Sequence, residues 1–145
     1  MFLTEKKLTW WEAKEECKQL AGWLVEIKSM EQNDALYEEA RKHNLVEAWI
    51  GLSDAGKEGE WVWTSGDKAT FLNWTPQSPD NARHNNRMGE NCAVLRTGAT
   101  TPRGKPWFTI KKWNDGSCET PVVAAICQNH PGGPKEWFSK KKWLR

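Results

Sequence analysis

The chain has 145 residues and a formal net charge of +2, which fits one domain of ordinary size with a real core. This charge is too small to indicate a nucleic-acid partner, and no segment approaches the roughly 18 apolar residues of a membrane span. We therefore expect a soluble globular domain. Its 11 tryptophans supply large rigid packing surfaces, and most of them should lie in the core.

The first third of the chain predicts two helices. Thr9 with Glu12 forms a capping-box pattern, and apolar residues then follow at helical spacing until the glycine at position 22. Ser29 with Gln32 repeats the pattern and opens a second helix, which ends near residue 43.

The remainder predicts short strands and one long loop. Apolar runs predict strands at residues 48–52, 61–63, 92–95 and 122–127. Residues 76–89 are polar and without periodicity, as in loops that are functional or disordered. Residues 130–145 read as a linker and a basic, aromatic-containing tail, a composition suited to anionic surfaces.

The four cysteines are Cys17, Cys92, Cys118 and Cys127. Without a C-x-x-C pair or a histidine pair, the pattern argues against structural zinc and favours two disulfides. Three pairings are possible, and spacing does not choose among them. Disulfides would place the protein outside the cytosol. Because the first residues do not form a secretory signal, we expect that any signal has been removed or lies upstream.

The segment Trp113-Asn114-Asp115-Gly116 allows two interpretations. Asn-Asp-Gly is ordinary turn chemistry. The alternative is a metal site with oxygen ligands fixed between a bulky tryptophan and the cysteine at position 118.

A series of short motifs, taken in order, resembles the C-type lectin-like domain. They are the helix with Trp10, Ala13 and Cys17, then Trp49-Ile50-Gly51-Leu52, Trp61-Val62-Trp63, Asn73-Trp74, Pro79, Gly89-Glu90-Asn91-Cys92, Trp113-Asn114-Asp115, Cys118 and Ile126-Cys127. The resemblance implies an α+β fold with two helices, mixed antiparallel sheets and a long calcium-binding loop region. We expect the domain at residues 1–129 and the tail at 130–145. It also implies the short form of the domain, with disulfides Cys17–Cys127 and Cys92–Cys118.

The resemblance further implies a calcium site that also binds sugar. In sugar-binding members the ligands come from a loop tripeptide with central proline, a glutamate and the Trp-Asn-Asp motif. The matching positions here are Ser78, Asp80, Glu90, Asn114 and Asp115. Calcium takes about six to eight oxygen ligands, which such side chains supply. The last four would also bond the sugar, and His84 is the only ring that the long loop offers.

The tripeptide Ser78-Pro79-Asp80 departs from the family pattern at its first position. Mannose-type members carry Glu-Pro-Asn and galactose-type members Gln-Pro-Asp, so Asp80 favours the galactose type. Ser78 offers only a short hydroxyl, which lowers the expected calcium affinity unless water or Gln77 completes the coordination. The alternative is a scaffold whose Trp-Asn-Asp motif only folds the loop.

Some members of the family hold an auxiliary calcium ion. The matching positions here are Asp54, Glu58, Asn81 and Asn91, of which two are amides where acids are commoner. Loss of charge lowers affinity for a divalent ion. The other hypothesis is that these are solvated loop residues.

Asn73-Trp74-Thr75 is a formal N-glycosylation sequon. Because the family places Trp74 in its core, a buried, hydrogen-bonded Asn73 is the alternative to a glycan.

The sequence predicts a secreted, calcium-dependent lectin that binds glycans, of the galactose type rather than the mannose type. It does not predict an enzyme, since no phosphate loop, nucleophile elbow or His-Glu-x-x-His occurs. The alternative is a lectin-like matrix, biomineral or adhesive protein that binds surfaces or proteins without sugar activity. Several copies could assemble, because single lectin sites bind weakly.

Overall fold

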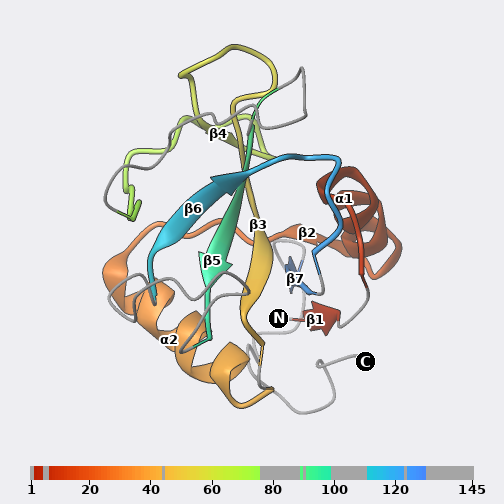
Figure 1. Cartoon of the computed structure of the whole chain (residues 1–145), viewed down its shortest axis with the longest axis vertical. Helices are drawn as coiled ribbons and strands as arrows, with labels where there is room; N and C mark the ends of the chain where they lie inside the picture. Colours follow the sequence, from red (N-terminus) through yellow and green to blue (C-terminus); the bar gives the residue numbers. More distant parts are fainter. Residues whose placement is uncertain are drawn as a thin grey trace.

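The computed structural model describes residues 2–4, 7–43, 45–75, 89, 91–98, 111–122 and 124–129. In chain order its elements are β1 (Phe2–Thr4), α1 (Trp10–Gln19), β2 (Gly22–Leu24), α2 (Met30–Arg41), β3 (Glu47–Ser53), β4 (Val62–Trp63), β5 (Cys92–Arg96), β6 (Trp113–Gly116) and β7 (Ala125–Asn129) (Figure 1). This arrangement confirms the predicted α+β class. Within the described residues, no helix has the length and apolar character needed to cross a membrane.

Both helices begin where their capping residues predict, but the two caps differ. At α1 the box is reciprocal, since Glu12 N donates to Thr9 Oγ1 at 3.1 Å and Thr9 N donates to Glu12 Oε1 at 2.9 Å. At α2 only half of it forms. Gln32 N donates to Ser29 Oγ at 3.1 Å, whereas Gln32 Oε1 accepts from Lys28 N at 2.9 Å. The Gln32 side chain therefore bonds the backbone of Lys28, before the helix, and not the backbone N–H of the N-cap residue Ser29.

One sheet holds the described strands, in the order β1-β7-β3-β5-β6, with β2 also paired to β7 and β4 to β3. Only the β3–β7 pair among them is parallel. The strands β1 and β2 were not predicted, because each has three residues and depends on its pairing with β7. The turn interpretation of residues 113–116 is wrong, since β6 pairs with β5 in register from Trp113 to Gly116.

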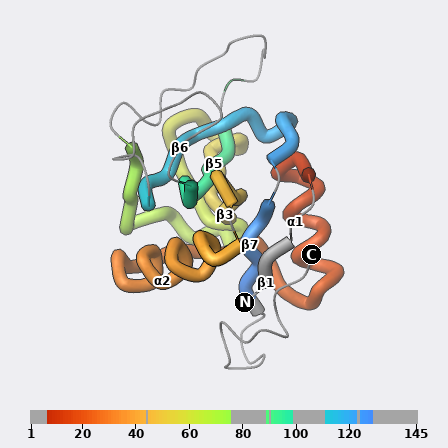
Figure 2. The backbone as a smooth tube through the Cα atoms, turned by 60° about the horizontal axis from the view of Figure 1, so that its bottom comes forward, coloured from red at the N-terminus to blue at the C-terminus, as the bar shows by residue number. Residues whose placement is uncertain are grey.

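The two helices lie on opposite sides of the central strands in both views (Figures 1 and 2). Alternation along β3 explains this arrangement. Ile50 faces a core that α2 covers through Leu36, and Trp49 faces a second core that α1 covers through Ala13. Strands β5 and β7 divide their side chains between the same two cores. The sheet is thus buried on both faces.

Gly51 in β3 is required by close backbone packing. A Cβ atom there would lie 2.7 Å from the carbonyl oxygen of Leu24 and 3.0 Å from that of Val25. The close approach also allows Gly51 N to donate to Val25 O at 2.8 Å. Residues that follow β2 are therefore fixed against the middle of β3.

Two disulfides complete the fold with the implied pairing. Cys17–Cys127 joins α1 to β7 across 110 residues, and Cys92–Cys118 joins the start of β5 to the segment after β6. In the loop-entropy picture each contributes about 3–5 kcal/mol, and more for the longer loop.

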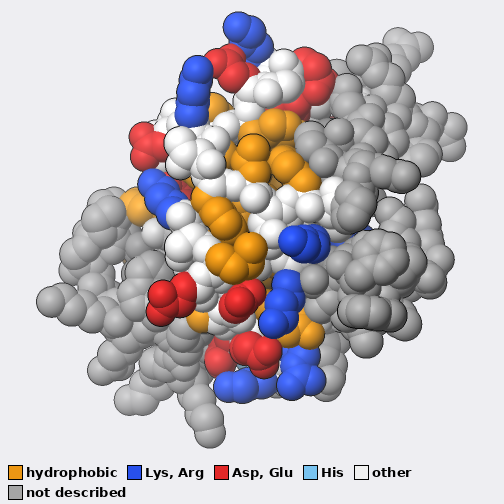
Figure 3. Space-filling model, turned by 90° about the vertical axis from the view of Figure 1, so that its left-hand side faces the viewer, with side chains coloured by type: hydrophobic (Ala, Val, Ile, Leu, Met, Phe, Trp, Pro, Cys, Tyr) orange, Lys and Arg blue, Asp and Glu red, His pale blue; other side chains and the backbone are white. Residues whose placement is uncertain are grey.

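The flank that carries the 60–75 segment shows a strip of hydrophobic side chains among charged ones (Figure 3). Trp61, Phe71 and Trp74 are partly buried against the core on the α2 side, and Leu72 is 48% exposed. This segment is therefore held by aromatic packing together with strand pairing to β3 and backbone hydrogen bonds to Trp113 of β6.

Candidate functional site

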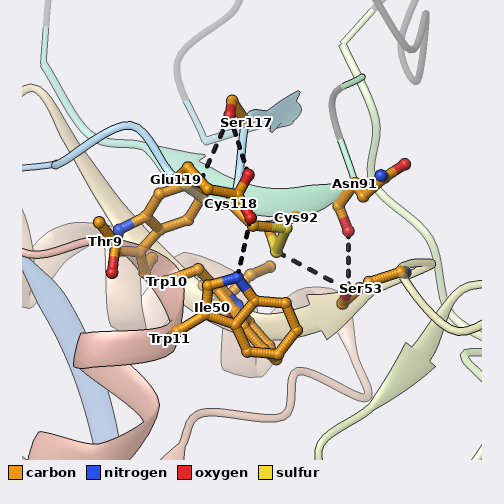
Figure 4. The surroundings of a disulfide bond; sticks show 12 residues. Thr9, Trp10, Trp11, Ile50, Ser53, Asn91, Cys92, Ser117, Cys118 and Glu119 are labelled. Carbon is orange, nitrogen blue, oxygen red and sulfur yellow. Dashed lines mark hydrogen bonds between the residues drawn. A yellow bond between two sulfur atoms is a disulfide. The ribbon is translucent and has the colours of Figure 1, made fainter. Parts of the chain in front are cut away.

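Three strand ends meet at one end of the sheet. Ser53 at the end of β3 pairs with Cys92 at the start of β5, and Cys92 pairs with Gly116 at the end of β6. The Cys92–Cys118 disulfide lies at this junction (Figure 4). The junction therefore collects the described members of both predicted calcium sites.

Asp54 directly follows β3 and is only 2% exposed. Its Oδ2 accepts from Gly59 N at 2.9 Å, and its own N–H donates to Asn91 O at 3.0 Å. The Oδ1 atom is buried, and no N–H group of the described residues donates to it. Glu58 hydrogen-bonds the Asp54 carboxyl from the same loop. The Asp54 carboxyl is thus buried, and its Oδ1 atom accepts no hydrogen bond from the described residues.

The pKa of Asp54 is raised to about 7. Burial is the main cause because it disfavours the charged form, and the hydrogen bond and negative charge of Glu58 act in the same direction. The bond from Gly59 N lowers the pKa but does not compensate. Two acidic groups in contact are the arrangement that a bound cation would relieve.

Asn91 is joined to the Asp54 loop through its backbone. Its carbonyl accepts from Ser53 Oγ at 2.8 Å as well as from Asp54 N (Figure 4). Its Oδ1 atom is also buried. The structure therefore brings the carboxyl groups of Asp54 and Glu58 into contact and joins the backbone of Asn91 to the same loop. These are three of the four predicted auxiliary ligands.

The Trp-Asn-Asp motif forms β6. Asn114 pairs with Val94 and is half-buried, whereas Asp115 pairs with Ala93 and is fully buried. Strand pairing with β5 and the nearby disulfide hold both residues on a rigid element, which favours precise ligand placement. These are the two predicted principal ligands that the described residues include.

Trp113 anchors this strand in the core. It is fully buried, as expected, with ring contacts to Trp63, Phe71 and Trp74. Its Nε1–H donates to Asn33 Oδ1 of α2 at 2.7 Å. A buried indole N–H needs such an acceptor.

Asn33 was missed by the sequence analysis. It is fully buried, and its Nδ2 donates to Lys111 O at 2.8 Å. Helical spacing could have indicated that Asn33 is buried, because it lies on the same face of α2 as the buried Leu36 and Ala40. A polar side chain on that stripe requires partners inside the protein.

Asn73 is buried and hydrogen-bonded, which favours the structural alternative for the sequon. It is 5% exposed, its Nδ2 donates to Lys111 O at 2.7 Å, and its Oδ1 accepts from Lys112 Nζ at 3.1 Å. Lys111 has a positive φ of 69° and places its Nζ 5.0 Å from the centre of the Tyr37 ring. Both lysines are thus engaged within the protein.

The other predicted site residues lie outside the described residues. They are Ser78, Asp80 and Glu90 of the principal site, Asn81 of the auxiliary site, His84 and the tail at 130–145. Among the described residues, no three His, Cys, Asp or Glu side chains are grouped to hold a metal. The carboxyl and amide oxygens of Asp54, Glu58 and Asn91 nevertheless fit calcium, which prefers hard oxygen donors.

Comparison with known proteins agrees with this architecture. Residues 6–129 match the family described as Lectin C-type domain. The low affinity immunoglobulin epsilon Fc receptor of Mus musculus is 32% identical over 119 residues, which cover 82% of this chain and 30% of the receptor. The alpha-N-acetylgalactosamine-specific lectin of Patiria pectinifera is 30% identical over 127 residues, covering 83% of this chain and 67% of that lectin.

A solved structure supports the same assignment. The cow C-type carbohydrate-recognition domain of CD23, determined in the presence of a GlcNAc2Man3 oligosaccharide, superposes with a TM-score of 0.69 at 30% identity. The match covers 86% of this chain and 82% of that domain. The chain spans about a third of the length of the first curated relatives it matches. From its family match, its fold and its disulfides, the chain belongs to the C-type lectin domain family.

Proposed function

We propose that this domain is an extracellular lectin that binds glycans through calcium, with galactose-type rather than mannose-type preference. The observation that carries the calcium part is the buried Asp54 carboxyl in contact with Glu58. A divalent cation would neutralise both groups and use the free Oδ1 of Asp54. The glycan part is supported by relatives and a structural neighbour whose names state carbohydrate recognition.

Two groups of residues would hold calcium. Asp54, Glu58, Asn81 and Asn91 would form the auxiliary site and stabilise the loop region. The principal site would use Ser78, Asp80, Glu90, Asn114 and Asp115, and a bound ion there supplies a positive centre for sugar hydroxyls. Asp115 fits this role, since β6 holds it on a rigid strand at the same sheet end as Asp54.

The sugar preference depends on the long loop. Asp80 follows Pro79 as in galactose-type members, and one relative is named for N-acetylgalactosamine. The neighbour determined with a mannose-containing oligosaccharide provides the competing hypothesis. Direct competition between galactose and mannose decides between them.

The test begins with a calcium titration of the EDTA-stripped chain by calorimetry and thermal unfolding. We expect saturable binding and a higher melting temperature, because a ligand of the native state stabilises it. Binding to immobilised N-acetylgalactosamine should then require calcium and be inhibited by galactose more strongly than by mannose.

Matched charge removals identify the residues responsible. Asp115→Asn should abolish calcium-dependent sugar binding, whereas Asp67→Asn removes the same charge from an exposed turn and should leave it intact. A wild-type chain without calcium heat or a melting shift would refute calcium dependence. Equal inhibition by the two sugars would refute the galactose preference alone.

The disulfides support an extracellular location, because such bonds persist in oxidising compartments. The surface-binding alternative rests on the tail at 130–145, outside the described residues, and stays a hypothesis. Adsorption to anionic surfaces that disappears with the tail, without any sugar binding, would favour it.

A further inference from the structure

We propose that a groove between α1 and β2 is a second binding site, specific for a sugar unit that carries a carboxylate or sulfate. The groove has a volume of 580 Å³ and is bounded by α1, the start of β2 and the turn at residues 64–65. This volume falls within the roughly 300–1,000 Å³ of small-molecule sites. None of its residues belongs to the predicted calcium sites, so the proposal does not depend on calcium.

Trp11 forms one wall, is 45% exposed, and is oriented by two contacts. Its Nε1–H donates to Glu119 Oε1 at 3.1 Å, and its ring meets Trp10 edge-on at 4.9 Å (Figure 4). Trp10 is itself fixed, since its Nε1–H donates to Ile50 O at 2.9 Å. A large aromatic surface that is immobilised before binding loses little entropy when a ligand stacks on it.

Trp23 of β2 supplies a second aromatic side chain to the groove and is half-buried. Ser65 adds an exposed side-chain hydroxyl, whereas the Oγ1 atom of Thr64 is buried. Indole rings offer apolar faces to the C–H groups of a pyranose, and the Ser65 hydroxyl can exchange a hydrogen bond with a sugar hydroxyl. Ring faces beside a hydroxyl favour a saccharide over an acidic peptide.

The charge of the groove selects an anionic sugar. Lys14 and Lys18 lie one helical turn apart and both line it. Within the described residues, neither lies at ion-pair distance from a carboxylate, and Lys14 Nζ is 5.8 Å from the centre of the Trp10 ring. Glu15 also lines the groove, so the lining residues carry one net positive charge, while the Glu119 carboxylate next to them is bonded to the Trp11 indole. One anionic group would balance that charge.

The test compares galactose 6-sulfate with galactose, two probes that differ only in the sulfate. The full chain is titrated in EDTA, and the indole N–H signals of Trp11 and Trp23 are followed by NMR after assignment with Trp11→Phe and Trp23→Phe. We expect saturable shifts of both signals with galactose 6-sulfate and clearly weaker binding of galactose. Because exposed charge pairs contribute modestly, Lys14→Gln with Lys18→Gln should weaken binding about fivefold.

Lys42→Gln with Lys57→Gln is the matched control, since it removes the same charge from exposed positions elsewhere. It should leave the affinity unchanged, and backbone spectra should show that both double variants are folded. The proposal is overturned if the indole signals do not shift, if galactose binds equally well, or if the control weakens binding as much. Equal shifts with a hexa-aspartate peptide would overturn the saccharide assignment. Because calcium is absent throughout, none of these results bears on the loop site.

Discussion

Replacing Asn33 with leucine tests how the core holds the Trp-Asn-Asp strand. Leucine keeps the branched shape and the number of heavy atoms of asparagine, with bulkier methyl groups, but leaves Trp113 Nε1–H, now bonded at 2.7 Å, buried without an acceptor. It also removes the 2.8 Å bond to Lys111 O, which keeps its second bond from Asn73. An unpaired buried donor costs about 1–3 kcal/mol and a lost bond about 1 kcal/mol, so we expect a loss of about 2–4 kcal/mol.

A double-mutant cycle with Trp113→Phe isolates the hydrogen bond. Phenylalanine keeps an aromatic ring but has no N–H, so in the double variant neither side chain leaves a polar group unpaired at this contact. We therefore expect a coupling energy of about 1–2 kcal/mol between the two changes. Urea unfolding followed by far-UV circular dichroism, with disulfides intact, gives the four free energies required.

A second cycle, Asn33→Leu with Trp49→Phe, is the control. Trp49 also loses an indole bond, to Leu8 O at 2.8 Å, but it lies in the core on the α1 side. The two changes should be additive within about 0.5 kcal/mol. Additivity in the Trp113 cycle as well would refute the view that Asn33 anchors the strand through Trp113.

Three further predictions concern the backbone, the sequon and pH. Gly51→Ala should lower the unfolding free energy by about 3 kcal/mol in urea, because its Cβ would lie 2.7 Å from Leu24 O; a loss below about 1 kcal/mol would contradict that packing. Expression in a eukaryotic secretory host should yield an Asn73 peptide of unmodified mass, and a glycan there in folded protein would refute the structural role. In EDTA, the raised pKa of Asp54, about 7, means that the folded state keeps a proton that the unfolded state releases near pH 4. Stability should therefore fall by about 2 kcal/mol or more from pH 5 to pH 8, and Asp54→Asn should flatten this dependence; an equal slope in both proteins would contradict the assignment.

The elements predicted correctly are those whose signals are local. Thr9 and Ser29 mark helix starts because a capping side chain bonds a backbone N–H three residues ahead. Strand β6 was ambiguous for the same reason, since Asn-Asp-Gly has local turn chemistry. Only its pairing with β5, set by tertiary structure, makes it extended.

The residues of the candidate sites were indicated only in part. The resemblance assigned Asn114 and Asp115 to the principal site and Asp54 to the auxiliary one, although 60 or more residues separate Asp54 from the other two. It did not indicate Asn33, because a partner for Trp113 on α2 becomes evident only when helix and sheet pack together. Residue types indicate possible ligands, whereas the hydrogen bonds that position them depend on the assembled core.

The described parts of the two predicted calcium sites are stabilised in different ways. Strand β6 is fixed by backbone pairing, by the buried Trp113 and by the Cys92–Cys118 disulfide, none of which requires a metal ion. Asp54 is different, because its burial beside Glu58 disfavours its charged form. The metal-free domain should therefore stay folded and hold a proton on Asp54 near neutral pH. Calcium binding would displace that proton, so the ion would act mainly on the loop while the sheet remains unchanged.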